Sequence, residues 1–288
     1  MSMTRRRMRP PPQRGFVNAL ATPSKTPRGK GKQTGSAMPH RNIDLTKPPD
    51  SCSRVAMDKP AEPFPQRLTE GYRSFLDDRF IREQSRYEEL GEHGQTPQIM
   101  LIGCCDSRVS PEVIFDAKPG EMFVARNIAN LVPPFQPDDQ LHGTSAALEY
   151  AVQGLKVKHI VVLGHGRCGG IRAFADDSQQ ALSPGDFIGK WITLIGPAAE
   201  RTGGRGRNES FDDYLHRLEL ASIQQSLANL RSFPCVQILE SKGRLHLHGA
   251  YFAVATGVLM ILDNATGQFI PAVGEMPKRV QQIRCSEA

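Results

Sequence analysis

Two short segments combine cysteine, histidine and charged side chains in patterns that could bind a metal ion. The first reads GCCDSR over residues 103–108, and the second reads GHGRCGG over residues 164–170. His165 and Cys168 lie in one glycine-flanked turn, and Cys104 or Cys105 could supply a third ligand. Two thiolates and one imidazole suit Zn²⁺. Three protein ligands leave one tetrahedral position for water, which is typical of a catalytic zinc site rather than a structural one.

The first segment also carries a carboxylate and a guanidinium two residues apart, Asp106 and Arg108. A carboxylate beside zinc could accept the hydrogen bond of a zinc-bound hydroxide and so orient this nucleophile. A bidentate arginine would hold that carboxylate in place and keep it ionised. The pattern therefore predicts a zinc site assisted by an Asp-Arg dyad.

These segments need a scaffold that brings them together, and each directly follows a short apolar run typical of a buried strand. Four such runs occur, over residues 99–102, 122–125, 160–163 and 236–239. Helical patterns over residues 144–152 and 211–230 lie between them. Buried strands separated by helices indicate a mostly parallel α/β sheet, in which ligands collect at the carboxyl ends of the strands. Residues 245–252 predict a later strand with alternating faces, at an edge.

Order is expected to begin near residue 65 with an amphipathic helix. Its apolar residues recur at spacings of three and four up to Leu90, and Gly91 and Gly94 are expected to end it. The apolar positions are Leu68, Tyr72, Phe75, Leu76 and Phe80. We expect a single folded unit over residues 65–275, followed by a short tail over 276–288.

The composition of the 288 residues allows a folded core and excludes several other classes. The chain is 39% hydrophobic, and its longest apolar stretch, Ala250–Leu262, is interrupted and too short to span a bilayer. Six cysteines do not indicate a disulfide scaffold. The net charge is +6, but residues 1–56 alone carry +10, so the remainder carries −4. A mildly acidic globular part gives no reason to expect nucleic-acid binding.

The basic segment over residues 1–60 is rich in Pro and Arg and has no helical or strand periodicity. We expect it to be a disordered extension. An organellar transit peptide is an alternative, because the segment is free of acidic residues up to Asp44, although its prolines oppose an amphipathic helix. Without an apolar export signal, and with cysteines expected to be reduced, a cytoplasmic location is expected.

The remaining cysteines and histidines are given structural interpretations. Small core or tail residues are expected at Cys105, Cys235, Cys52 and Cys285. Hydrogen-bonded polar groups are expected at His93, His159 and His216. His246 and His248 alternate on the strand predicted over 245–252 and could form a metal-binding pair, but the sequence shows no third partner.

Taken together, the motifs resemble those of the β-class carbonic anhydrases. The family pattern Cys-x-Asp-Ser-Arg is present at 104–108, and His-x-x-Cys-Gly is present at 165–169. Further matching stretches lie at 94–97, 119–121, 126–132 and 145–152. The resemblance covers residues 66–265, and residues 1–60 have no counterpart in it.

The resemblance implies a role for each matching residue. It assigns the ligands of one Zn²⁺ per chain to Cys104, His165 and Cys168, and the catalytic dyad to Asp106 and Arg108. It places a substrate-binding glutamine at Gln95 and an apolar substrate wall, partly contributed across a dimer interface, at Phe123, Ile128 and Tyr150. It also implies four parallel strands with an added antiparallel edge strand, flanking helices, and an N-terminal helical arm that embraces a neighbouring subunit in a dimer or larger assembly.

The implied reaction is the reversible hydration of CO₂ to bicarbonate and a proton by zinc-bound hydroxide. Two alternatives stay open on sequence alone. One is a hydrolase that acts on a CO₂ analogue with the same residues. The other is a non-catalytic zinc protein in which Asp106 closes the site as a fourth ligand.

Overall fold

The computed structural model describes residues 64–138, 140–176, 182 and 185–274. The predicted extension over residues 1–60 and the tail over 276–288 lie outside this range, together with Cys52 and Cys285. Among the described residues, no helix is both long and apolar enough to cross a membrane.

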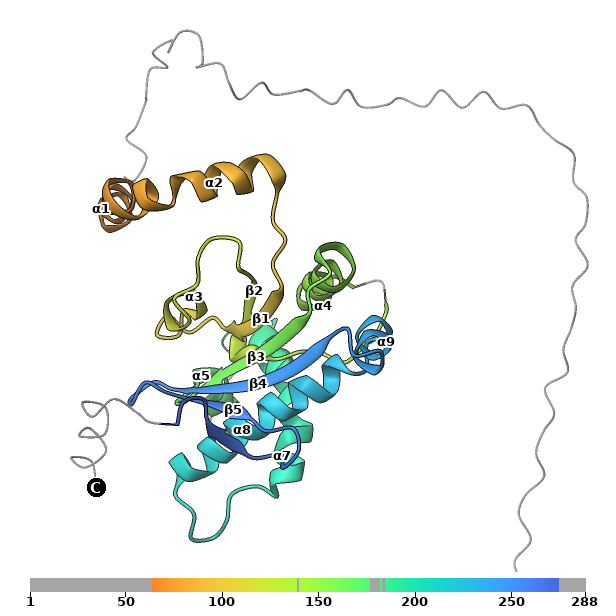
Figure 1. Cartoon of the computed structure of the whole chain (residues 1–288). Coiled ribbons are helices and arrows are strands. Elements are labelled where there is room, and N and C mark those ends of the chain that lie inside the picture. The colour runs from red at the N-terminus through yellow and green to blue at the C-terminus, as the bar shows by residue number, and fades with distance from the viewer. Residues whose placement is uncertain (1–63, 139, 177–181, 183–184, 275–288) are drawn as a thin grey trace, which may run out of the picture. The chain divides into compact units, whose positions relative to one another are not determined.

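A single sheet at the centre of the described part positions both metal-binding segments (Figure 1). Its strand order is β2-β1-β3-β4-β5-β6. The strands are β1 (Ile99–Cys104), β2 (Met122–Asn127), β3 (His159–His165), β4 (His246–Ala253), β5 (Val258–Leu262) and β6 (Phe269–Pro271). The first four are parallel, whereas β5 and β6 are antiparallel. The mostly parallel α/β sheet is confirmed, with two antiparallel strands at one side instead of one.

The prediction of a strand over residues 236–239 is wrong, because this run lies in helix α9 (Pro234–Ser241). The fourth parallel strand is β4, which lies between β3 and β5 and not at the predicted edge. A four-residue apolar run does not distinguish a strand from a helix. Pro234 at the first helical position and the one-sided burial of Val236, with Ile238 exposed, favour the helix.

The other helical segments flank the sheet or extend from it. They are α1 (Gln66–Ser74), η1 (Phe75–Phe80), α2 (Ile81–His93), α3 (Pro111–Ile114), η2 (Ile128–Asn130), α4 (Gly143–Glu149), η3 (Tyr150–Leu155), α5 (Gly169–Ala175), α6 (Phe187–Ile192), η4 (Thr193–Ile195), α7 (Gly196–Thr202) and α8 (Phe211–Leu230). The 20-residue helix α8 begins where the Ser210 side chain accepts from the backbone N–H of Asp213. Its Ile223 and Leu227 pack with Ile160 and Leu247 of the sheet. This packing holds β3 and β4 in register behind the metal-binding segments.

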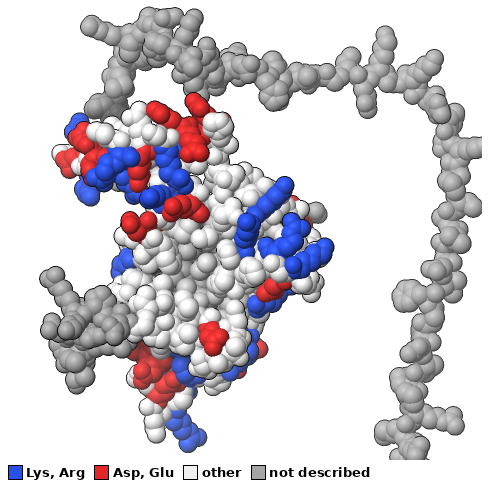
Figure 2. All heavy atoms as spheres, in the orientation of Figure 1, with Lys and Arg blue, Asp and Glu red and all other residues white. Residues whose placement is uncertain are grey.

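The helices from α1 to α2 form the arm (residues 66–93), and none of its residues is buried. Arg79 of η1 and Arg86 of α2 donate to backbone carbonyls of the loop before β2, so these two segments of the arm are attached to their own chain. Leu68, Tyr72 and Ile81 are each more than half exposed. Figure 2 shows both signs of charge over this arm. Gly91 lies inside α2, and the helix ends at Gly94, whose φ of 77° suits glycine.

Candidate metal and catalytic site

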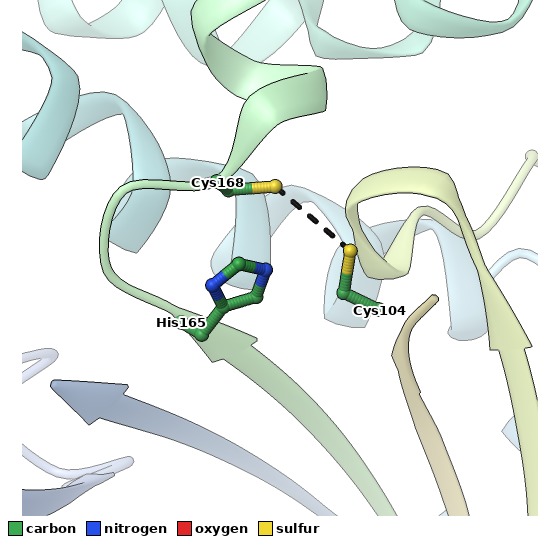
Figure 3. Close-up of side chains that lie close together, drawn as sticks. All are labelled: Cys104, His165 and Cys168. Atoms are coloured by element: carbon green, nitrogen blue, oxygen red, sulfur yellow. Dashed lines mark hydrogen bonds between the residues drawn. The ribbon is translucent and has the colours of Figure 1, made fainter. Parts of the chain in front are cut away.

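Cys104 and His165 end the neighbouring parallel strands β1 and β3, so the sheet places them side by side. Cys168 follows three residues later, immediately before helix α5. The sulfur atoms of Cys104 and Cys168 are 4.0 Å apart (Figure 3). One ligand atom of each of the three residues lies within 4.8 Å of the others, and all three side chains are buried. We call these residues the Cys2His cluster.

The hydrogen bonding of His165 leaves one ring nitrogen ready to bind a metal. Its Nδ1 lies 3.0 Å from the carbonyl oxygen of Gly166. Since a carbonyl only accepts, Nδ1 carries the proton and Nε2 keeps its lone pair. The buried Nε2 has no hydrogen-bond partner in the structure. A buried nitrogen without a partner costs free energy, and a metal ion held with the two cysteine sulfurs would satisfy it.

The surroundings of Cys104 stabilise a thiolate. The hydrogen bond from the Cys168 thiol lowers the pKa of Cys104, and the same interaction raises the pKa of Cys168. The backbone N–H of Ala129 also donates to the Cys104 sulfur, at 3.3 Å. Ala129 and Asn130 hold this turn with φ values of 63° and 48°, a conformation that is costly for non-glycine residues. The two cysteines therefore share one proton, which a divalent cation could replace.

Asp106 and Arg108 form the predicted dyad through three hydrogen bonds. Oδ1 of Asp106 accepts from the backbone N–H and from Nε of Arg108, both at 2.9 Å, and Oδ2 accepts from Nη2 at 2.7 Å. This guanidinium holds the pKa of Asp106 well below its usual range. Oδ2 also lies 3.9 Å from Nε2 of His165, so an ionised carboxylate oxygen faces the Cys2His cluster.

Arg126 has a role at the site that the sequence patterns alone do not reveal. Its Nε donates to the carbonyl of Cys104 at 2.8 Å, and its Nη2 donates to the carbonyl of Asp106 at 2.7 Å. Arg126 is paired with Gly103 across β1 and β2, so it fastens the segment that carries both a cysteine and the dyad. The signal available in the sequence was an arginine directly after a predicted buried strand.

Glu219 on α8 is a second residue whose role the sequence patterns do not reveal. Its Oε1 accepts from the backbone N–H of Cys168 at 3.0 Å, and its Oε2 accepts from the Tyr251 hydroxyl at 3.0 Å. Burial raises the pKa of Glu219. Glu219 and Tyr251 also line a cavity of about 200 Å³, together with His216 and with Gly166 and Arg167 of the metal-binding segment. A glutamate inside an apolar helical pattern gave no sign that it supports a cysteine 51 residues earlier.

The four predicted substrate residues fall into two groups. Ile128 lies next to the Cys2His cluster, since it directly precedes Ala129, whose backbone N–H donates to the Cys104 sulfur. The carbonyl of Ile128 accepts a hydrogen bond from Trp191. Phe123 is paired with Met100 at the beginning of β1, four residues or about 13 Å from Cys104 along the strand. Tyr150 packs on Phe123 with ring centroids 5.7 Å apart. Gln95 is exposed and precedes β1. These last three residues therefore lie near the opposite end of β1 from the cluster of the same chain.

The structural interpretations of the other residues have mixed outcomes. Cys105 is exposed, so its prediction as a small core residue is wrong, because it lies just after the end of β1, whose last five residues are all buried. Cys235 is half-buried beside the core. His216 lies 3.0 Å from the Tyr251 hydroxyl, and His93 Nδ1 lies 3.3 Å from a helical carbonyl, as expected of hydrogen-bonded histidines.

Comparison with known proteins defines the class to which this fold and site belong. The family model for carbonic anhydrase matches residues 99–259. Beta carbonic anhydrase 3 of Arabidopsis thaliana is 36% identical over 194 residues, which are 67% of this chain and 74% of that protein.

Solved structures agree with this match. The β-carbonic anhydrase CcaA is 28% identical with a TM-score of 0.66, over 73% of this chain and 93% of that one. A structure from work on two tetrameric β-carbonic anhydrases of Sordaria macrospora is 26% identical with a TM-score of 0.60, over 68% of this chain and 95% of that one. The fold and the buried Cys2His cluster are those of a zinc enzyme of the α/β class. The chain belongs to the β-carbonic anhydrase family.

Proposed function

We propose that this protein catalyses the reversible hydration of CO₂ to bicarbonate and a proton, with one zinc ion per chain. The observation that carries this function is the buried Cys2His cluster, with an unpartnered Nε2 of His165, beside an ionised Asp106. Zinc bound by these three residues would supply a Lewis acid that makes water nucleophilic near neutral pH.

Asp106 is the residue that we assign to positioning the attacking water. Its Oδ1 accepts two hydrogen bonds from Arg108, whereas Oδ2 accepts one and faces His165. A carboxylate oxygen can accept a further hydrogen bond, so Oδ2 can take one from a water molecule at the cluster. This bond orients the oxygen lone pair of the water towards CO₂. Arg108 keeps the carboxylate ionised and fixed.

The same hydrogen bonds favour an open site over a closed, non-catalytic one. If Asp106 became a fourth metal ligand, the metal would compete for Oδ2 with Nη2 of Arg108, which donates to it at 2.7 Å. Arg108 is itself held by the carbonyl of Arg167 at 3.1 Å. The alternative of a hydrolase for a CO₂ analogue uses the same residues, and a substrate panel on the purified protein would distinguish the two.

We further propose that the active form is a dimer or a larger assembly in which a second chain completes the substrate wall. Ile128 is beside the cluster of its own chain, but Gln95, Phe123 and Tyr150 are not. Strand β2 is an edge strand, and the arm leaves its apolar side chains uncovered. These features support association through β2 and the arm, which would bring the three remaining residues to the cluster of a partner.

A subunit-mixing experiment tests the shared site. Cys104→Ser removes a metal ligand, and Tyr150→Ala alters the wall, so each homo-oligomer should be nearly inactive. Unfolding and refolding the two together should restore activity in mixed dimers, because one of the two sites is then intact. Mixtures that stay as inactive as the parents would overturn the shared-site proposal. The mixed-dimer fraction is measured by mass spectrometry.

The catalytic proposal itself is tested by loss of the metal. His165→Ala should remove zinc and CO₂ hydration together, whereas His93→Gln, at an exposed histidine on the arm, should change neither. A His165→Ala variant that hydrates CO₂ at the wild-type rate would contradict the proposal. The cytoplasmic location stays a prediction that fluorescence imaging of the tagged full chain can test.

A further inference from the structure

Three histidines lie together at the beginning of strands β3 and β4. His159 is the first residue of β3 and is paired with His246, the first residue of β4. His248 follows two residues after His246, so strand alternation places it on the same face. That face also carries Leu163 and Ala250. We call His159, His246 and His248 the three-histidine cluster.

The rings of this cluster are in contact. Nδ1 of His159 and Nε2 of His248 are 3.1 Å apart. The ring of His246 stacks on that of His159, with centroids 5.3 Å apart and an interplanar angle of 26°. His159 and His248 are half-buried, whereas His246 is exposed. Two nitrogens at this separation can also be ligands of a single metal ion, since Zn–N distances of about 2.0–2.1 Å place neighbouring ligand atoms slightly more than 3 Å apart.

We propose that the three-histidine cluster is a second metal site, which binds a divalent transition cation such as Zn²⁺ or Ni²⁺ through imidazole nitrogens. The sequence offered His246 and His248 as a possible pair without a third partner, and the parallel pairing of β3 with β4 supplies His159. His246 becomes the third ligand when its exposed ring turns away from the ring of His159, and water molecules occupy the remaining coordination positions of the metal. Neutral imidazole is the donor that these cations favour.

The electrostatics of the cluster favour the neutral form that a metal needs. Burial lowers the pKa of His248, and the nearby His159 and His246 lower it further. Neighbouring imidazoles repel one another when protonated, and a bound cation would replace the hydrogen bond between His159 and His248 with two ligand bonds.

This site is separate from the Cys2His cluster, although one strand carries a residue of each. His159 begins β3 and His165 ends it, six residues or about 20 Å apart. The second site does not depend on the proposed catalytic function. A metal ion bound there would link the beginnings of β3 and β4, at the end of the sheet opposite the catalytic segments.

Nickel binding to the zinc-loaded, tag-free full chain tests the proposal. Ni²⁺ is the probe because it favours imidazole and does not oxidise the exposed Cys105. After equilibrium dialysis at pH 7.5, zinc and nickel per chain are counted by mass spectrometry. We expect one nickel in addition to one zinc, with a first shell of nitrogen and oxygen by X-ray absorption.

The variants separate this cluster from other histidines. His248→Gln and His159→Gln should weaken nickel binding at least tenfold, and His246→Gln should weaken it less. His93→Gln is the control and should bind as the wild type does. The zinc content and the CO₂ hydration rate should not change in the His246→Gln variant. Unchanged values verify that this substitution at an exposed position leaves the fold intact. The proposal would be overturned if nickel bound only by replacing zinc, or if X-ray absorption showed a sulfur ligand to nickel. Undiminished nickel binding in the His246→Gln and His248→Gln variants would also overturn it.

Discussion

The backbone N–H of Cys168 donates a hydrogen bond of 3.0 Å to Oε1 of Glu219, a buried carboxyl on the central helix α8. The other carboxyl oxygen of Glu219 accepts from Tyr251 on β4. One side chain thus connects a predicted metal ligand to both the sheet and its main covering helix. Residues that orient ligands in this way commonly change metal affinity by about 10- to 100-fold when they are replaced.

Glu219→Leu should therefore weaken zinc binding by about tenfold or more. The change leaves the buried Cys168 N–H without a partner, which costs about 1–3 kcal/mol, whereas the Tyr251 hydroxyl keeps His216 at 3.0 Å. Glu219→Gln keeps an acceptor for Cys168 and should have a smaller effect. Zinc affinity is measured by competition with a chromophoric chelator. Wild-type affinity in the leucine variant would show that Glu219 does not support the metal site.

Replacement of Asp106 should separate metal binding from catalysis. Asp106→Asn leaves the Cys2His cluster intact but removes the ionised acceptor, so zinc should stay at one per chain while kcat/KM for CO₂ falls about 100-fold or more. Asp212→Asn, at an exposed position in the first turn of α8, is the control. Full hydration activity in Asp106→Asn would contradict the assigned role of the carboxylate.

Two adjacent glycines provide a matched pair for testing the turn that donates to Cys104. A Cβ at Gly170 would lie 2.7 Å from Ile128 Cγ2 and 3.0 Å from Ala129 Cβ, whereas a Cβ at Gly169 would meet nothing within 4 Å. Gly170→Ala should destabilise the fold by about 1–3 kcal/mol and reduce hydration activity. Gly169→Ala should leave both nearly unchanged. Equal urea midpoints of unfolding for the two variants would show that the turn at Ile128 and Ala129 does not require a glycine at position 170.

The ion pair of Glu209 with Arg217 predicts a pH-dependent contribution to stability. Hydrogen bonds from Arg217 lower the pKa of Glu209 from 4.5 to about 2. Because the pKa is lowered in the folded state, the stabilisation is present above pH 4.5 and is lost as the pH falls towards 2. Glu209→Gln should therefore lower Tm at pH 7, and the difference from the wild type should narrow below pH 4.5. A difference that is constant between pH 7 and pH 3 would exclude this contribution.

Local sequence patterns predicted that the residues of the Cys2His cluster come together, because these residues lie at or just after the ends of buried strands. Apolar runs at 99–102 and 160–163 placed Cys104 and His165 at adjacent strand ends, and the i, i+2 spacing placed Asp106 beside Arg108. The helix over 211–230 was also predicted with its observed bounds. In each case the signal is local, so it depends little on distant parts of the chain.

The features that the sequence did not reveal depend on contacts between distant segments. Nothing near Glu219 in the sequence points to Cys168, and the position of Arg126 after a predicted strand does not show that it contacts Cys104. Only the packed sheet and α8 bring these residues together. The run at 236–239 was ambiguous for the same reason, since burial on one side or on both decides between helix and strand. His159 could be matched with His248 only after β3 and β4 were known to be neighbours.

The most direct test of the central claim is stopped-flow CO₂ hydration over a pH series, with zinc quantified on the same sample of full-length protein. The account predicts one zinc per chain and fast hydration that rises towards high pH as zinc-bound water ionises. One zinc per chain with no hydration at any pH would contradict it, because the open site beside Asp106 would then not be catalytic.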